Sequence, residues 1–169
     1  MKCEDIPLIL DLPYPPVETC GKNPRYAMLL TTDYAGQNGE LTAITTYLFQ
    51  HFICSNEKIH EAMKAVAMVE MRHMGFLGEL IHMYGGCPTI GMQNGGRTCF
   101  WSGNYVSYNT NPCSFLKSNI VQEQAAINTY QNRISQIQDE PVRALLRRII
   151  KDEEHHIRIF ENLLCELNN

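Results

Sequence analysis

One segment of this sequence occurs twice, at positions 40 and 123, which are 83 residues apart. Residues 40–47 read ELTAITTY and residues 123–130 read EQAAINTY. At the same spacing, residues 70–73 (EMRH) correspond to residues 153–156 (EEHH), so that a Glu-x-x-His motif is also repeated. A repeat of this kind indicates two copies of one structural unit that bury their apolar faces against each other.

Apolar side chains recur at steps of three and four residues through most of the chain, which is the period of an amphipathic helix. The pattern predicts four long helices, over residues 26–54, 56–84, 114–138 and 140–168. Ser114 is the predicted N-cap of the third helix, and Asp139 with Pro141 marks the start of the fourth. The predicted fold class is all-α: a four-helix bundle built from two repeated helical hairpins, which turn near Ser55 and Gln138.

Two parts of the chain lack a helical period. Residues 1–25 contain five prolines and predict an extended arm on the surface of a bundle formed by residues 26–169. Residues 85–113 hold six of the eleven glycines and predict a long connection without paired strands. The repeat favours parallel second and third helices, in which case this crossover runs the length of the bundle; the alternative is a short cap at one end, with the two helices antiparallel. Its expected anchors are the aromatic residues Phe100, Trp101, Tyr105 and Tyr108.

Four repeated glutamates fall at one height of the predicted bundle. Glu40, Glu70, Glu123 and Glu153 each lie 15 residues from the nearest predicted turn. At ~1.5 Å per residue, all four are about 22 Å from their turns and on the buried stripes. An unpaired buried charge costs several kcal/mol, and no Lys or Arg occupies these stripes near this level. Some other positive charge must therefore balance the carboxylates.

Two divalent cations would match the four negative charges. In each Glu-x-x-His motif the carboxylate and the imidazole share one helix face, so both can reach the same ion. One Glu from each of two helices and a Glu-x-x-His from each of the other two form the ligand set of di-iron and di-manganese carboxylate bundles. Carboxylate and imidazole ligands suit Fe and Mn alike. The predicted metal ligands are Glu40, Glu70, His73, Glu123, Glu153 and His156.

This pattern resembles the ferritin-like superfamily across residues 26–167. Residues 36–41 (GQNGEL), followed by Tyr47 and Gln50, are similar to the first helix of manganese catalases and their shorter spore-coat relatives. Rubrerythrin is a more distant resemblance, because Ala126 stands where rubrerythrins carry an additional glutamate and the chain has no C-x-x-C pair. The resemblance implies a di-iron or di-manganese centre that reacts with hydrogen peroxide or oxygen, in a homo-oligomer.

Several neighbouring residues have two interpretations each. Tyr47 and Tyr130 lie seven residues after a predicted ligand, and each hydroxyl either donates to a ligating carboxylate or belongs to a plain core aromatic. Asp152 either orients a ligand histidine, as in related carboxylate-bridged enzymes, or lies on a solvated face. Gly36 and Gly39 either allow close helix packing or open a path to the metals.

Three functions follow from the pattern and its resemblance. The first is a di-metal oxidoreductase acting on hydrogen peroxide, catalase-like, in which Glu153 is a ligand or a proton relay. The second is a ferroxidase or iron-binding ferritin-like protein. The third is a structural protein of the spore-coat type with a metal site.

The composition limits the binding partners and the cellular compartment that we expect for this protein. The net charge is −4 and no basic run occurs, so nucleic acid and anionic membrane surfaces are poor partners. No stretch approaches the ~20 apolar residues of a membrane span. The first residues lack the pattern of a signal peptide, and the seven cysteines include no C-x-x-C pair. We expect a cytoplasmic protein.

Overall fold

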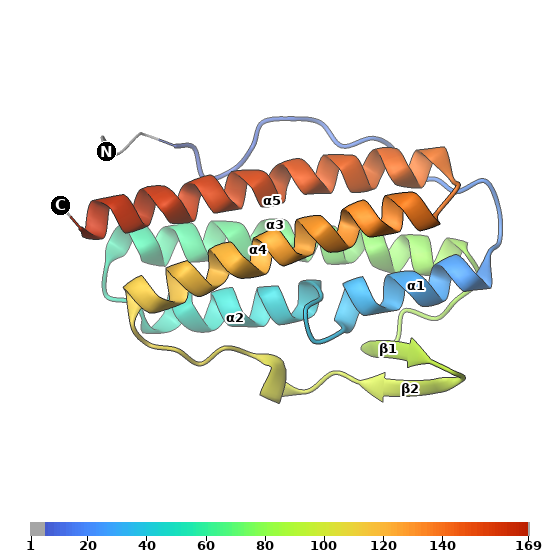
Figure 1. Cartoon of the computed structure of the whole chain (residues 1–169), viewed down its shortest axis with the longest axis horizontal. Coiled ribbons are helices and arrows are strands. Elements are labelled where there is room, and N and C mark those ends of the chain that lie inside the picture. Colours follow the sequence, from blue (N-terminus) through green and yellow to red (C-terminus); the bar gives the residue numbers. More distant parts are fainter. Residues whose placement is uncertain (1–5, 169) are drawn as a thin grey trace.

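The computed structural model describes residues 6–168 and forms a bundle of four helical rods (Figure 1). One rod consists of two shorter helices, α1 (Pro24–Ala35) and α2 (Glu40–Ile53). The other three are α3 (Glu57–Met83), α4 (Pro112–Gln136) and α5 (Glu140–Leu167). The predicted four-helix bundle is confirmed, with a small β-hairpin added to it.

The predicted single helix over residues 26–54 is wrong, because the rod breaks between Gly36 and Gly39. Gly36 ends α1 with extended backbone, and Gly39 is the N-cap of α2. A Cβ atom on Gly39 would lie 2.5 Å from the carbonyl oxygen of Asp33, so no other residue fits there without a shift of the backbone. The break makes Glu40 the first residue of α2, where unpaired backbone N–H groups favour a negative charge.

The helix ends differ from expectation at one cap. Asn111 is the N-cap of α4 and its side chain accepts from the backbone N–H of Ser114, so the prediction of Ser114 as the cap is wrong. Asparagine followed by Pro112 is as good a start signal as serine, and it begins the helix earlier. Asp139 precedes α5 as predicted, although its carboxylate accepts from the Tyr84 hydroxyl at 2.9 Å instead of capping the helix.

The crossover contains a two-stranded antiparallel hairpin, β1 (Gly91–Asn94) and β2 (Arg97–Phe100), which contradicts the prediction of no paired strands. The turn residues Gly95 and Gly96 have φ angles of +55° and +79°, the conformation of the Asn-Gly type of tight turn. The crossover then returns to the far end of the bundle, so that α3 and α4 run parallel as predicted (Figure 1).

The predicted aromatic anchors divide into two pairs. Trp101 is partly buried and donates from Nε1 to the Thr42 hydroxyl at 2.9 Å, and Tyr105 packs edge-on against it. Phe100 and Tyr108 are 70% and 59% exposed, so the prediction is wrong for them. The reason for Phe100 is that it ends β2, the strand farther from the bundle, while β1 packs against α1 (Figure 1).

The core consists of two apolar clusters, one toward each end of the bundle, and the buried acids lie between them. Leu80 and Leu145 belong to one cluster, and Met63 and Phe160 to the other. Residues 6–23 run as an extended segment along α5 (Figure 1). Positions 1–5 of the predicted arm, like Asn169 at the end of the predicted bundle, lie outside the described residues. Within residues 6–168, no helix is long and apolar enough to cross a membrane.

Candidate metal centre

The six predicted ligands come together at the middle of the bundle, and each is at most 5% exposed. They form two overlapping groups, whose ligand-type atoms lie within 4.8 Å of one another in each group. One group consists of Glu40, Glu70, His73 and Glu153, and the other of Glu70, Glu123, Glu153 and His156. The repeat and the equal heights therefore predicted a real convergence of side chains from four helices.

Glu70 and Glu153 each present one oxygen to each histidine. The two oxygens of Glu70 lie 3.0 Å from His73 Nδ1 and 2.9 Å from His156 Nδ1. Those of Glu153 lie 3.2 Å and 3.0 Å from the same two nitrogens. Each of the other two glutamates, the outer ones, lies near one histidine. Glu40 Oε1 is 4.0 Å from His73 Nδ1, and Glu123 Oε1 is 3.6 Å from His156 Nδ1. The carboxylates of Glu70 and Glu153 thus lie between two similar sets of side chains. One set also contains His73 and Glu40, and the other also contains His156 and Glu123.

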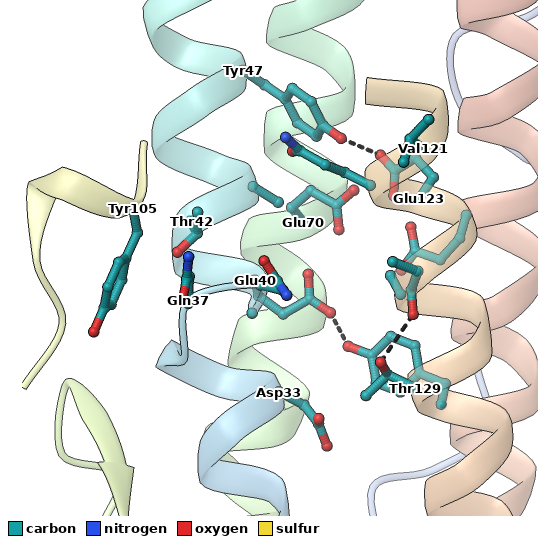
Figure 2. A pocket seen from close by; sticks show the side chains of 18 residues that line it. Asp33, Gln37, Glu40, Thr42, Tyr47, Glu70, Tyr105, Val121, Glu123 and Thr129 are labelled. Atoms are coloured by element: carbon teal, nitrogen blue, oxygen red, sulfur yellow. Dashed lines mark hydrogen bonds between the residues drawn. The ribbon is translucent and has the colours of Figure 1, made fainter. Parts of the chain in front are cut away.

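The two tyrosines reach carboxylates of the opposite repeat. Tyr47 donates its hydroxyl hydrogen to Glu123 at 2.5 Å, and Tyr130 donates to Glu40. Figure 2 shows the first of these bonds across the pocket between α2 and α4. The structure therefore favours the hydrogen-bonding interpretation, with the partners exchanged between the two halves rather than kept within each.

Burial and crowding displace the pKa values of the cluster. Burial raises the pKa of Glu40 well above its usual range, and the neighbouring charge of Glu70 raises it further. Burial, followed by Glu70 and Glu153, raises the pKa of Glu123 to about 8. Burial, the largest single effect, opposes the charged form of Glu70 too, but the charges and hydrogen bonds of His156 and His73 together outweigh it and lower the pKa of Glu70.

The pKa values of His73 and His156 shift in the direction opposite to that expected from burial alone. Burial disfavours the charged ring, but the surrounding carboxylates, Glu153 beside His73 and Glu70 beside His156, raise both pKa values. Without a cation, the cluster therefore holds extra protons at neutral pH, which offset part of the carboxylate charge.

The residues present fit a pair of metal ions. Glu70 Oε1 and Glu153 Oε1 are buried and have no hydrogen-bond partner among the described residues. Each His Nδ1 lies within 3.2 Å of two different carboxylates but can donate one hydrogen, so the two histidines by themselves leave an oxygen unsatisfied on each side. Buried polar atoms without partners are costly, and a cation between them satisfies both. The donor set of carboxylate oxygen and imidazole nitrogen suits Mn or Fe.

Asp152 lies behind His73, on the side away from the carboxylates. Its Oδ2 is 3.0 Å from His73 Nε2, which favours the orienting interpretation over the solvated face. Tyr14 and Arg148 also reach the same oxygen, at 2.6 Å and 2.7 Å. Burial opposes ionisation of Asp152, but the bond from His73 and those from its other partners lower its pKa to about 2. The sequence did not single out Tyr14 or Arg148: Arg148 has only its four-residue spacing from Asp152, and nothing marks Tyr14 within the arm.

A cavity of about 280 Å³ leads to the cluster from the side of the bundle that the crossover partly covers. All four glutamates and both tyrosines line its inner part, and the helix break at residues 37–39 forms part of its wall. Tyr105, Val121 and Thr129 lie around it (Figure 2). The two interpretations of Gly36 and Gly39 are therefore compatible, because the tight break that requires glycine also borders the opening.

A buried ion pair borders the same cavity. Arg133 on α4 donates to both carboxylate oxygens of Asp33 on α1, at 2.7 Å and 3.1 Å. Burial raises the pKa of Asp33 to about 6 even though Arg133 opposes the shift. The pair joins the two halves of the chain beside the opening and was not predicted from the sequence.

This chain belongs to the ferritin-like domain family, whose model matches residues 35–169. Within that family it is similar to a probable manganese catalase of Clostridium acetobutylicum, with 30% identity over 166 residues, which cover 88% of this chain and 74% of that protein. It is also similar to the bacterioferritin of Desulfovibrio desulfuricans, with 31% identity over 136 residues, covering 77% of this chain and 70% of that one.

Solved structures show the same fold. The manganese catalase KatB of Anabaena PCC7120 matches with a TM-score of 0.85 and 24% identity, over 95% of this chain and 80% of that one. The Desulfovibrio desulfuricans bacterioferritin, whose structure contains a diiron site, matches with a TM-score of 0.66 and 26% identity, over 86% and 81%. The predicted ferritin-like fold and the resemblance to manganese catalases are confirmed.

Proposed function

We propose that this chain binds two divalent metal ions, Mn or Fe, through Glu40, Glu70, His73, Glu123, Glu153 and His156. One observation carries the proposal: Glu70 and Glu153 each belong to both ligand groups, and Oε1 of each has no hydrogen-bond partner among the described residues. Glu70 and Glu153, which belong to both groups, would contribute to holding both ions, while each outer glutamate and histidine would help to hold one.

We further propose that the bound centre disproportionates hydrogen peroxide, so that two peroxides give two waters and one oxygen. A dinuclear Mn or Fe site supplies the two-electron redox change that this reaction needs. Support comes from the probable manganese catalase that matches most of this chain and from the cavity that leads to the carboxylates. A cavity of this size admits a molecule as small as peroxide and is lined by groups that can exchange its protons.

The residues around the cavity have separate roles in this proposal. The hydroxyls of Tyr47 and Tyr130 hold the outer glutamates in place, because each donates to a carboxylate oxygen that faces an ion position. Glu153 borders the cavity, and its Oε1 has no hydrogen-bond partner among the described residues, so it can hold a metal or a peroxide proton. Asp152 keeps Nδ1 of His73 directed at the carboxylates by binding Nε2.

The experiment combines metal analysis with an oxygen electrode. Protein purified without added metal is analysed for Mn and Fe, and oxygen release is then measured as peroxide is consumed. We expect two metals per chain and one oxygen per two peroxides. Glu70→Gln should abolish oxygen release, while Glu154→Gln, on the exposed side of the same helix turn as Glu153, should leave it unchanged. Two bound metals without oxygen release would refute the catalase proposal while leaving the metal site in place.

The second candidate function is iron oxidation, favoured by the similarity to bacterioferritin. Added Fe²⁺ would then be consumed with oxygen or peroxide as oxidant, and iron would exceed two ions per chain. A metal-bound chain inactive in both assays would indicate the structural role considered for spore-coat relatives. The homo-oligomer and the cytoplasmic location stay predictions, for which light scattering and cell fractionation are the tests.

A further inference from the structure

The extended segment before α1 is held against α5 next to the metal centre. The carbonyl oxygen of Leu12 accepts from the guanidinium of Arg148 at 2.8 Å. Two residues later, the hydroxyl of Tyr14 donates to Asp152 at 2.6 Å. The arm is therefore fixed to α5 within one helical turn of the predicted ligands at residues 153 and 156.

The ring of Tyr14 is held as firmly as its hydroxyl. Its centroid lies 4.8 Å from that of Phe76 on α3, and the Arg148 guanidinium stacks over it at 4.2 Å. The ring also meets the His73 imidazole edge-on, at 6.3 Å between centroids. These contacts to α3 and α5 hold the ring with its hydroxyl against Asp152.

Asp152 is the point through which Tyr14 reaches His73. An ionised carboxylate has no hydrogen to donate, so in the bond between Asp152 and His73 the hydrogen lies on Nε2. When His73 is neutral, as it must be to bind a metal, its lone pair is therefore on Nδ1, the nitrogen that faces Glu70 and Glu153. Groups that hold a ligand histidine from behind in this way fix its tautomer and its orientation.

The two halves of the site differ at this point. The 83-residue repeat places Val69 where the second half has Asp152, and a valine side chain cannot accept a hydrogen bond. His73 is therefore supported by a carboxylate from the other half of the chain, whereas the repeat supplies His156 with no equivalent acid. The pseudo-symmetry of the ligands does not extend to the residues behind them.

We propose that Tyr14 is a positioning residue for one of the two metal ions: it fixes Asp152, which holds His73, and so makes the ion on the His73 side the more tightly bound of the two. This inference rests on the proposed di-metal site. It assigns to the proline-rich arm a part in metal binding, and it predicts two unequal affinities in a ligand set that is otherwise duplicated.

The test is a titration of the metal-free chain with Mn²⁺, in which isothermal calorimetry measures the heat of binding of each ion. The wild type should bind two ions in two resolvable steps. Tyr14→Phe removes one hydroxyl and should weaken the tighter step about tenfold, the lower end of what loss of a residue behind a ligand costs, with the weaker step unchanged. Asp152→Asn should weaken the same step at least as much. Tyr26→Phe is the matched control, since Tyr26 is also half-buried and also uses its hydroxyl in a hydrogen bond.

The outcomes separate this inference from the function on which it rests. The positioning role is supported if Tyr14→Phe loses affinity only in the tighter binding step and the metal-free variant melts at a temperature close to that of the wild type. Unchanged affinities in Tyr14→Phe, or equal weakening of both steps, would overturn it and leave the di-metal site intact. A wild-type chain that binds no Mn²⁺ or Fe²⁺ would refute the proposed function and this inference together.

Discussion

Replacing Glu123 with glutamine should stabilise the metal-free protein at neutral pH, although it removes a proposed ligand. Glu123 is 3% exposed, and burial with the charges of Glu70 and Glu153 raises its pKa from 4.5 to about 8. Without metal, folding at pH 7.5 therefore requires Glu123 to take up a proton or to carry a poorly compensated charge. Glutamine has nearly the same shape, can still accept from Tyr47 and never ionises.

The size of the effect follows from the shift of the pKa. A carboxyl group with a raised pKa contributes its full stability below the unfolded value and loses it as the pH rises toward the folded value. Each unit of difference corresponds to ~1.4 kcal/mol, so from pH 4.5 to 7.5 the loss from Glu123 reaches about 4 kcal/mol as an upper bound. The raised pKa values of His73 and His156 act in the same direction as the pH rises. The lowered pKa of Glu70 acts oppositely, below its unfolded value of 4.5.

The measurement is urea unfolding of chelator-treated protein at pH 5, 6 and 7.5, monitored by circular dichroism. The metal-free wild type should lose stability between pH 5 and 7.5, and Glu123→Gln should lose less by the contribution of Glu123, since Glu40, His73 and His156 still titrate in the variant. The two proteins should be similar near pH 5 and differ by up to about 4 kcal/mol at pH 7.5. After loading with Mn²⁺ the order should reverse, since the variant has lost a ligand. Glu154→Gln serves as the control, because residue 154 is exposed.

The reasoning would be refuted by a difference between wild type and variant that is the same at every pH. That result would mean that Glu123 titrates normally, so that the carboxylates are not clustered as described. A loaded variant more stable than the loaded wild type would refute the role of Glu123 as a ligand.

Three further results are expected. Glu70→Ala should lower metal content from two ions to one or none, because Glu70 belongs to both candidate ligand groups, while His60→Ala should leave the content unchanged by elemental analysis. Gly39→Ala should cost on the order of 1–3 kcal/mol of unfolding free energy, since its Cβ would meet the carbonyl of Asp33. Arg133→Met should cost about 3–5 kcal/mol by leaving Asp33 buried and unpaired, and adding Asp33→Asn should recover most of this in a double-mutant cycle.

The sequence predicted the features that depend on helical period and on the repeat. Glu40 and Glu123 were placed at one level because regular helices convert residue number into height, and the structure brings their side chains into one cluster. The helix break was missed because the apolar stripe continues through it, so the period gives no sign that Gly36 and Gly39 interrupt the backbone hydrogen bonds. A pattern of side chains reports which face is buried and not whether the rod is continuous.

The contacts of the arm could not have been predicted in the same way. Tyr14 and Asp152 are 138 residues apart, and the path of an irregular segment has no period that fixes where its side chains lie. The β-hairpin did have a signal, Asn94 followed by Gly95 and Gly96, but strands of four residues are too short for alternation to mark them. The predicted burial of Phe100 as an anchor was wrong for the same reason, because its strand was not anticipated.

The exchange of tyrosine hydrogen bonds between the two halves has a consequence for how such a chain can change over time. Tyr47 belongs to the first half and binds Glu123 of the second, while Tyr130 belongs to the second and binds Glu40 of the first. A substitution in either half therefore alters the surroundings of a candidate ligand in the other half. The two halves cannot change independently at these four positions, whereas the residues behind the histidines, where Val69 corresponds to Asp152 in the repeat, differ between the halves.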